Sequence, residues 1–330
     1  MKQAQIRSFK RFNRGLSLIE LMVSLTIGLI LMIAVISAYL GSAGAGRMAE
    51  AQGRMNEDAN AALTILTQQL RMAGNNPKQP NYTDVPPRNP VYGTSTFIVR
   101  GCDGGFSDVA TAANIPALTC AGGASTRPDA IAISYEADRY NTVPLANFSP
   151  TDCLGQGLVD PTNALFTANR SVSNGVTSTV QAVTYTVADN RFYVGTSTSS
   201  TTPSLYCRGN GGTGANAAGQ PLVENVEDLQ LLYGTAVSTA TSTLAVAGYL
   251  DAASVVSNAG LALLATDQDR WSKVVTVRIC IVVRSEALVV SNTVSAQYVK
   301  CDGTVETSPP DLRLRRAYST TVVLRNRLTL

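Results

Sequence analysis

The chain has no histidine among its 330 residues and only one tryptophan. Without histidine there is no Ser-His or Cys-His pair for nucleophilic catalysis, and a zinc site would have to use thiolates and carboxylates alone. No two cysteines have the two-residue spacing of a redox or zinc motif. The composition therefore favours a protein that is not an enzyme and holds neither a metal ion nor a cofactor.

Charged residues are also scarce, at 15% of the chain, and they are unevenly distributed. Lys2, Arg7, Lys10, Arg11 and Arg14 give the N-terminal segment five positive charges and no acid. Setting these aside leaves 21 Lys and Arg against 23 Asp and Glu, so no strongly basic domain is left to bind nucleic acid. A group of arginines near the C-terminus alternates with apolar residues and is interpreted as part of a strand with one solvated face: Arg313, Arg315, Arg316, Arg325 and Arg327.

An apolar run from Leu16 to Leu40 follows the cationic segment. As a helix it would be about 37 Å long at about 1.5 Å per residue, enough to cross a hydrocarbon core of about 30 Å. The positive charges before it predict a cytoplasmic N-terminus, with the bulk of the chain on the other side of the membrane. A secretory signal would have a shorter apolar region and a small-residue cleavage site, whereas a plain signal anchor is a direct alternative.

Glu20 is the one charged residue within this run. A carboxylate in a membrane-spanning helix costs several kcal/mol and indicates a functional site with a partner. The alternative is that Glu20 reaches the cytoplasmic interface and has no further role. Together with the residues before it, Glu20 forms the following motif: Arg14-Gly15-Leu16-Ser17-Leu18-Ile19-Glu20.

This motif resembles the processing site of type IV prepilins. The resemblance implies that a peptidase cuts between Gly15 and Leu16 and methylates the new N-terminal amine of Leu16. It also implies that Glu20 meets the amine of a neighbouring subunit in a helical bundle, where such a pair would set the register. The family usually has Phe at the position of Leu16.

Helical periodicity resumes after the apolar run. Three glycines between residues 41 and 46 each cost about 1 kcal/mol relative to Ala in a helix, so a weak point is expected there. Gly74 and Pro77 then supply a stop, which predicts one helix from Leu16 to Ala73. Apolar residues at three- and four-residue spacing predict that its second half packs on a sheet: Met55, Ala59, Ala62, Leu63, Leu66 and Leu70.

The remaining sequence is typical of short strands joined by polar loops. The clearest strand is Lys273 to Arg284, where Val275, Val277, Ile279, Ile281 and Val283 fall on one face. Asp189-Asn190 is placed as a hairpin turn between two of the other strands. The other predicted strands are Thr96 to Arg100, Ala130 to Glu136, Gln181 to Val187, Arg191 to Gly195, and Tyr318 to Arg327 as a partner that closes the sheet.

Six cysteines lie in the part that is predicted to be exported: Cys102, Cys120, Cys153, Cys207, Cys280 and Cys301. An even number of cysteines in an oxidising compartment indicates disulfides. Several connectivities are open, and we favour the sequential one because two of its three pairs close short loops. It joins Cys102 to Cys120, Cys153 to Cys207, and Cys280 to Cys301.

Two other patterns have the residue types of a functional site but favour a structural interpretation. Asp103, Asp108, Asp129 and Asp138 are interpreted as surface or turn residues rather than an acid/base pair, and the loop from Cys102 to Asp108 does not match the EF-hand pattern for Ca²⁺. The glycine-rich segment 209–214 lacks the lysine and the helix of a phosphate loop and is interpreted as a flexible loop.

Several later segments resemble the PilW-type minor pilins, in the order of that family. They are the helix end at Glu57 to Gly74, the strand Pro128 to Glu136, the block Leu222 to Gly234, Trp271 to Ser285, and Arg315 to Leu328. The resemblance implies an α+β type IV pilin fold with a long helix on an antiparallel sheet. The expected organisation is a cleaved leader (1–15), a membrane or pilus-core helix (16–40), the amphipathic half of the helix (41–75) and a β-rich head (76–330).

The resemblance also implies a function and partners. It implies a tip-associated subunit that helps to initiate pilus assembly and supports motility and adhesion. The implied partners are other minor pilins and the major pilin, the prepilin peptidase, the inner-membrane assembly platform and a PilY-type tip protein. The implied location is the bacterial inner membrane, with a periplasmic head, and then the pilus tip. A pilus-displayed adhesin and a type II secretion pseudopilin are the alternatives.

Overall fold

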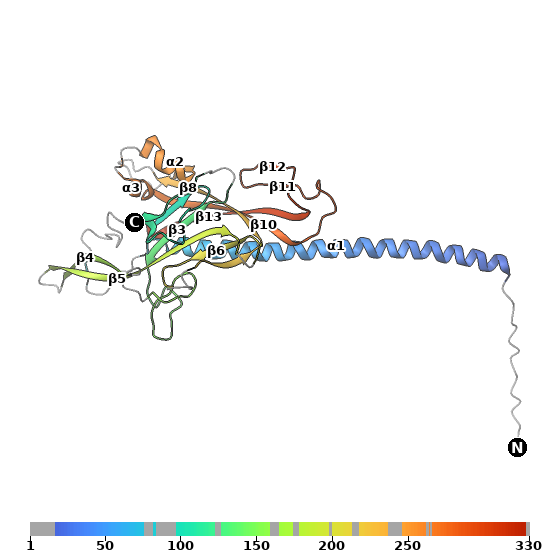
Figure 1. Cartoon of the computed structure of the whole chain (residues 1–330), viewed down its shortest axis with the longest axis horizontal. Coiled ribbons are helices and arrows are strands. Elements are labelled where there is room, and N and C mark those ends of the chain that lie inside the picture. Colours follow the sequence, from blue (N-terminus) through green and yellow to red (C-terminus); the bar gives the residue numbers. More distant parts are fainter. Residues whose placement is uncertain are drawn as a thin grey trace, which may run out of the picture. The chain divides into compact units, whose positions relative to one another are not determined.

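The chain divides into two compact units, residues 1–50 and 51–330. Figure 1 shows the long helix α1 and the labelled strands of the second unit. The computed structural model describes residues 17–75, 82–83, 97–122, 127–158, 165–173, 178–197, 200–212, 218–236, 246–261, 264 and 266–327.

Helix α1 (Leu18–Met72) contains both the apolar run and the amphipathic stretch. It is helical through all three glycines between residues 41 and 46, where a weak point is expected. Its end agrees with the predicted stop, since Gly74 has a left-handed φ of 70°. A Cβ atom at Gly74 would also lie 3.0 Å from the Ile98 side chain, so both backbone conformation and space favour glycine here.

The first sheet has seven antiparallel strands in the order β1-β4-β5-β3-β2, with β6 beside β5 and β7 beside β6. Strand β5 is the longest and pairs along its length with β4, β3 and β6. All seven residues of β3 are buried, so this strand lies in the interior of the fold. The strands are β1 (Tyr82–Thr83), β2 (Val99–Cys102), β3 (Ala130–Glu136), β4 (Leu165–Ser173), β5 (Ser178–Gly195), β6 (Ser204–Arg208) and β7 (Gln220–Glu224).

The second sheet has four antiparallel strands in the order β13-β10-β8-β9. These are β8 (Val226–Ala236), β9 (Val246–Leu250), β10 (Val274–Leu288) and β13 (Arg313–Val323). Strand β7 passes into β8 through Asn225, so the two sheets are consecutive in the chain. The smaller elements are η1 (Ile115–Ala117), α2 (Ala252–Ser257), η3 (Ala259–Leu261), α3 (Asp267–Trp271), the hairpin β11 (Tyr298–Val299) and β12 (Val305–Glu306), and η4 (Arg325–Arg327).

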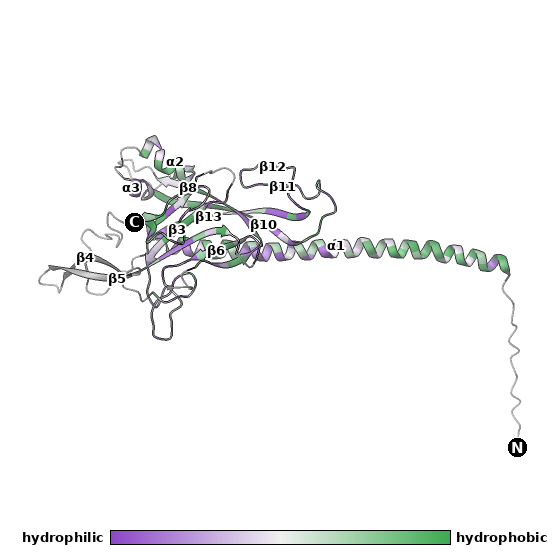
Figure 2. Ribbon diagram, in the orientation of Figure 1, coloured by the Kyte–Doolittle hydropathy of each residue, from purple (hydrophilic) through white to green (hydrophobic). Residues whose placement is uncertain are grey.

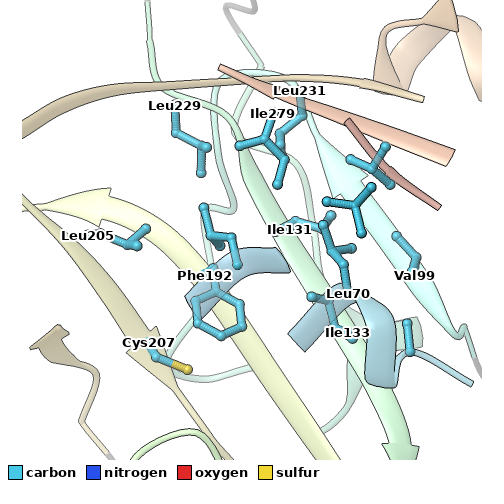
Figure 3. Packing of buried hydrophobic residues seen from close by; sticks show 14 of the residues in the cluster. Leu70, Val99, Ile131, Ile133, Phe192, Leu205, Cys207, Leu229, Leu231 and Ile279 are labelled. Carbon is cyan, nitrogen blue, oxygen red and sulfur yellow. The ribbon is translucent and has the colours of Figure 1, made fainter. Parts of the chain in front are cut away.

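The hydrophobic core lies between the second half of α1 and strands of both sheets. Met55, Ala59, Ala62, Leu66 and Leu70 are the buried residues of α1, and they follow the predicted three- and four-residue spacing. The predicted inner face of β10 is buried at all five positions. Figure 3 shows Leu70 among side chains labelled on other elements, including Ile131, Ile133 and Phe192. The α+β architecture expected from the sequence is confirmed.

The hairpin turn predicted at Asp189-Asn190 is wrong. Both residues lie within β5, and the two strands predicted on either side of them are one continuous strand. Their polar side chains have partners within the fold, because Asp189 binds Arg191 on the same strand and Asn190 binds Gln69 of α1. A polar pair that indicates a turn in the sequence is thus accommodated in a buried strand.

Other boundaries differ by a few residues. Strand β3 coincides with the prediction, whereas β2 begins three residues later than expected, at Val99. Strand β10 extends to Leu288, and β13 begins at Arg313 rather than Tyr318 and ends at Val323. These two closing strands pair antiparallel, as expected, from Thr276 opposite Val323 to Arg284 opposite Arg315, and the register shifts between Arg284 and Leu288.

The six cysteines form three disulfides in the sequential pairing. Cys102–Cys120 closes the loop before β3, Cys153–Cys207 links a loop to β6, and Cys280–Cys301 links β10 to the segment between β11 and β12. Each bond lowers the conformational entropy of the unfolded chain. This stabilises the folded state of a protein with long irregular connections.

Candidate assembly surface

The first half of α1 presents an apolar surface without a partner in the described part of the chain. Its most apolar window is not buried at all, and by length and composition the helix can cross a membrane. Every residue from Leu18 to Leu40 is exposed. In Figure 2 the ribbon of this stretch has mostly the colour of hydrophobic residues. Because such a surface is unfavourable in water, it indicates contact with lipid or with other apolar helices.

Three hydroxyl groups within this surface are satisfied by the helix itself. The hydroxyls of Ser24, Thr26 and Ser37 donate to backbone carbonyls three or four residues earlier, at 2.8 to 3.0 Å. Glu20 is different, because it lies exposed in the first turn of α1 and has no hydrogen bond or ion pair among the described residues. Its position near the positive end of the helix dipole is favourable for a carboxylate.

The sequence-predicted cleavage site lies at the edge of what is described. Gly15 and Leu16 are outside the described residues, which begin with Ser17. The Ser17 carbonyl accepts the Leu21 amide at 3.1 Å, so the helical hydrogen-bond pattern already includes Ser17. Positions four residues apart on a helix share one face, so in a helix that continued to residue 16 Glu20 would lie on the face of that residue.

The C-terminal end of α1 is capped by a side chain from the end of the chain. Asn326 donates its amide to the carbonyls of Arg71, Met72 and Ala73 at 3.0, 3.4 and 3.2 Å. The last carbonyls of a helix have no partner within it, so a side-chain donor at this point stabilises the helix end. No local pattern predicts this contact, because the two segments are about 250 residues apart.

Asn190 joins the helix to the first sheet. Its side-chain amide donates to Gln69 at 2.9 Å and to the Tyr135 hydroxyl at 3.1 Å, while its oxygen accepts the Cys153 amide at 3.1 Å. The residue is fully buried, so these three partners replace water. Helix, sheet and the disulfide-bonded loop therefore share one polar junction inside an apolar core.

A second buried polar group lies beside it on β5. Arg191 is 2% exposed and binds Asp189 through two nitrogens, at 3.0 and 2.8 Å. A third nitrogen donates to the carbonyls of Val109 and Ala112, each at 2.9 Å. Arg191 thereby fixes the disulfide-closed loop against the sheet, and its charge is balanced by a carboxylate two residues earlier in the strand.

The interpretation of the C-terminal arginines as solvated is wrong for Arg315. Its side chain is 1% exposed, and it binds Glu227 at 2.6 and 2.9 Å and Asp311 at 2.8 Å. Arg284 donates to the same Glu227, and Arg313 to the same Asp311. Burial raises the pKa of Asp311, but the hydrogen bonds from Arg315 and Arg313 outweigh it and hold that pKa well below its usual range. This network ties β13 to β8 and β10.

Asp129 is buried rather than solvated, which corrects its interpretation as a surface or turn residue. Its two oxygens accept the amides of Gly104, at 3.1 Å, and Leu231, at 2.8 Å. Burial raises the pKa of Asp129 to about 7, although the two amides oppose that shift. The carboxylate holds the loop after β2 against β8. Its place immediately before a run of apolar residues was the only sign of this role in the sequence.

The other three acids accept backbone amides, as turn and capping residues do. Asp103 accepts the first two amides of α2, Asp108 accepts the Thr119 amide, and Asp138 accepts two amides in its own turn. Among the described residues no group of three or more His, Cys, Asp or Glu side chains is placed to hold a metal ion.

The glycine-rich segment is better fixed than predicted where it is described. The Asn210 side chain donates to the Val187 carbonyl and accepts the Asp189 amide, both at 2.9 Å. The Gly211 amide donates to Asp152 at 3.0 Å. Residues 213 and 214 lie outside the described residues.

Two family models match the sequence. Residues 191–326 match the model described as type IV pilus-assembly protein W, and residues 10–36 match the prokaryotic N-terminal methylation motif. The first segment contains β8, β10 and β13, and the second contains Gly15, Leu16 and Glu20.

Among solved structures, a type IV-like pilin from Thermus thermophilus is similar to this chain at 10% sequence identity, with a TM-score of 0.36. The similarity covers 84% of this chain and 99% of that chain. No curated protein matches the sequence.

Proposed function

We propose that the chain is a minor, tip-associated pilin of the PilW type that helps to initiate pilus assembly, because residues 191–326 match the model of type IV pilus-assembly protein W and residues 10–36 match the N-terminal methylation motif. In that role it supports pilus-dependent motility and adhesion as a structural protein rather than an enzyme. The observation that carries the proposal is the exposed apolar surface from Leu18 to Leu40 with one carboxylate in its first turn. Such a surface is suited to a bundle of similar helices.

We propose that the chain is processed and oriented as its N-terminus suggests. A prepilin peptidase cuts between Gly15 and Leu16 and methylates Leu16, while the cationic residues before the cut stay in the cytoplasm. Residues 16–40 first span the inner membrane and later enter the pilus core. Residues 41–75 and the head, 76–330, lie in the periplasm and then at the pilus tip, where three disulfides are compatible with an oxidising environment.

In this proposal Glu20 sets the register between neighbouring helices. After the cut, the amine of Leu16 carries a positive charge that needs a partner in a medium of low dielectric constant. Glu20 has no partner among the described residues of its own chain and can supply one to the next subunit.

The test is Glu20→Ala, with Ser24→Ala as the matched control, because the Ser24 hydroxyl is already satisfied within the helix. Both variants should be cut normally, and only Glu20→Ala should be depleted in sheared pilus fractions. Normal incorporation of Glu20→Ala would contradict the role in registry.

The proposed partners follow from the same two surfaces. The apolar helix contacts other minor pilins and the major pilin, and before assembly it contacts the membrane, the peptidase and the assembly platform. The head contacts neighbouring minor pilins and a PilY-type tip protein. Nucleic acid is not among the proposed partners, since the chain without its N-terminal cations carries a small excess of acids.

Deletion of the gene in a piliated cell distinguishes this function from its two alternatives. Loss of surface pili supports the assembly role. Intact pili with lost adhesion would instead support an adhesin displayed on the fibre, and lost protein secretion would support a type II secretion pseudopilin. Complementation with the full chain is the control in each case.

A further inference from the structure

The loop that follows β3 is ordered by its own hydrogen bonds. The Asp138 carboxylate accepts the amides of Tyr140 and Asn141, at 2.7 and 2.8 Å, and the Asn141 side chain donates to the carbonyl of Glu136. Farther along, the Thr151 hydroxyl donates to the Val143 carbonyl at 2.7 Å. The loop therefore has a defined shape before it meets any partner, which lowers the entropic cost of binding.

This loop nevertheless exposes large apolar side chains. Residues 143–148 are all exposed. Tyr140 is 80% exposed, Val143 82% and Phe148 67%, with Leu145 also exposed. Tyr140 and Phe148 are large aromatic residues, a class that often carries much of the binding energy in protein interfaces.

Phe148 is held in a backbone conformation that costs free energy. Its φ is 63°, a left-handed value that is uncommon outside glycine and asparagine and is an outlier for a bulky residue. The Phe148 amide donates to the Leu145 carbonyl at 2.8 Å, so a tight turn fixes the conformation. Strain of this kind, at a residue whose ring does not fill the core, is typical of binding sites.

The charge of the loop restricts the choice of partner. Arg139 is exposed, its guanidinium lies 4.8 Å from the centre of the Tyr140 ring, and it has no ion pair among the described residues. The loop's acid, Asp138, is already bound to two amides. A single cation is too little for a membrane-binding basic patch. A symmetric contact between two copies of this loop would offer Arg139 no other carboxylate, because Asp138 is the only acid among residues 138–150.

We propose that residues 138–150 are a docking loop for another protein subunit of the same pilus. The partner presents an apolar pocket, which receives Phe148 and Val143, bordered by a carboxylate that pairs with Arg139. This inference rests on the proposed function, because it takes the partner from the fibre.

The first test separates binding from folding. Phe148→Asn removes the ring, and asparagine tolerates a left-handed conformation better than phenylalanine does. The full-length chain in detergent micelles should therefore unfold at the same or a higher temperature. A lower unfolding temperature would show that the ring stabilises the fold and would overturn the proposal.

The second test identifies the partner in intact cells. A photo-crosslinking aromatic amino acid at position 140 of the full chain should form a crosslink to a different pilus subunit, located by mass spectrometry. Phe148→Asn and Arg139→Glu should each lower the crosslink yield by about tenfold or more. Val299→Asn is the matched control, because Val299 is also exposed but lies on β11, and it should leave the yield unchanged.

Rescue tests the chemistry that we assign to the partner. Changing the crosslinked subunit's nearest carboxylate to lysine should restore the yield with Arg139→Glu. Crosslinks only to lipid, only to a second copy, or to no subunit would overturn the proposal even if the chain is present in sheared pili, and the proposed function would then stand. Absence of the unmodified chain from pili would overturn both.

Discussion

Replacing Arg315 by methionine removes the central cation of the network that joins β13 to β8. Three hydrogen bonds to carboxylates are lost, at 2.6, 2.9 and 2.8 Å. Breaking a buried ion pair costs about 3 to 5 kcal/mol. Glu227 keeps Arg284, Asp311 keeps Arg313, and the two carboxylate side chains are 20% and 26% exposed. These residual partners place the expected loss of unfolding free energy near the lower limit, at about 3 kcal/mol.

A loss of this size is measurable in the full-length chain in detergent micelles. For a domain of this size it corresponds to a fall in melting temperature of about 6 to 12 °C. Trp271 is the only tryptophan of the chain, and its ring packs edge-on to Tyr233 at 4.7 Å, so its fluorescence reports unfolding of the same core. The disulfides should be kept oxidised, so that both variants start from the same state.

Arg316→Met is the matched control, because Arg316 is the next residue and is exposed. It should change the unfolding free energy by no more than about 0.5 kcal/mol. Combining Arg315→Met with Glu227→Gln should cost less than the sum of the two single changes, since they remove the same interaction. A loss below about 1 kcal/mol for Arg315→Met, the range of an exposed ion pair, would show that burial adds nothing to this network.

Three further changes test other parts of the structure. Leu70→Ala deletes a fully buried side chain where α1 meets the sheets and should cost about 2 to 5 kcal/mol of unfolding free energy; a cost under about 1 kcal/mol in urea unfolding would mean that the helix is not packed there. Gly74→Ala must adopt a φ of 70° beside Ile98 and should cost at least about 1 kcal/mol; an unchanged urea midpoint would rule out the tight cap. Asp129 has a pKa raised by burial to about 7, so its contribution to stability is fully present below its ordinary pKa of 3.8 and is lost as the pH rises through 7. The urea midpoint should therefore fall between pH 5 and pH 8, and the fall should be smaller in Asp129→Asn; equal slopes would exclude Asp129 as the cause.

Local patterns in the sequence predicted the elements whose residues act mainly through burial. The alternation of Val275 to Val283 is enough to orient β10, because one face of that strand packs on the core. The spacing of Met55 to Leu70 orients the second half of α1 for the same reason. Gly74 ends the helix through a left-handed backbone conformation, which glycine adopts without help from neighbouring residues.

Polar residues in the interior could not be predicted in this way. Asp189-Asn190 has the composition of a turn, yet both residues lie in a buried strand. Asp189 is bound by Arg191 of the same strand, and Asn190 binds Gln69 of the distant helix α1. Arg315 alternates with apolar residues like a surface arginine, and its burial depends on Glu227, which is 88 residues earlier in the chain. Such contacts depend on which segments the fold brings together, and no local pattern carries that information.

In the candidate site, too, local sequence patterns predict some features, whereas others depend on contacts between distant segments. The apolar run, Glu20 and the processing motif are contiguous, so the sequence alone places the assembly surface. The Asn326 cap and the Asn190 junction, which hold the head on the helix, join segments that are 253 and 121 residues apart in the chain. The exposed loop around Phe148 was also beyond prediction, because its exposure and its left-handed turn are properties of the folded chain.

The intact mass of this chain in pili sheared from the cell surface, measured with N-terminal fragmentation, tests directly whether it is a processed pilin. We expect a chain that begins at Leu16, carries one methyl group on its α-amine and has three disulfides. If the chain retains residues 1–15, or is absent from the sheared fibre, it is not a processed subunit of the pilus.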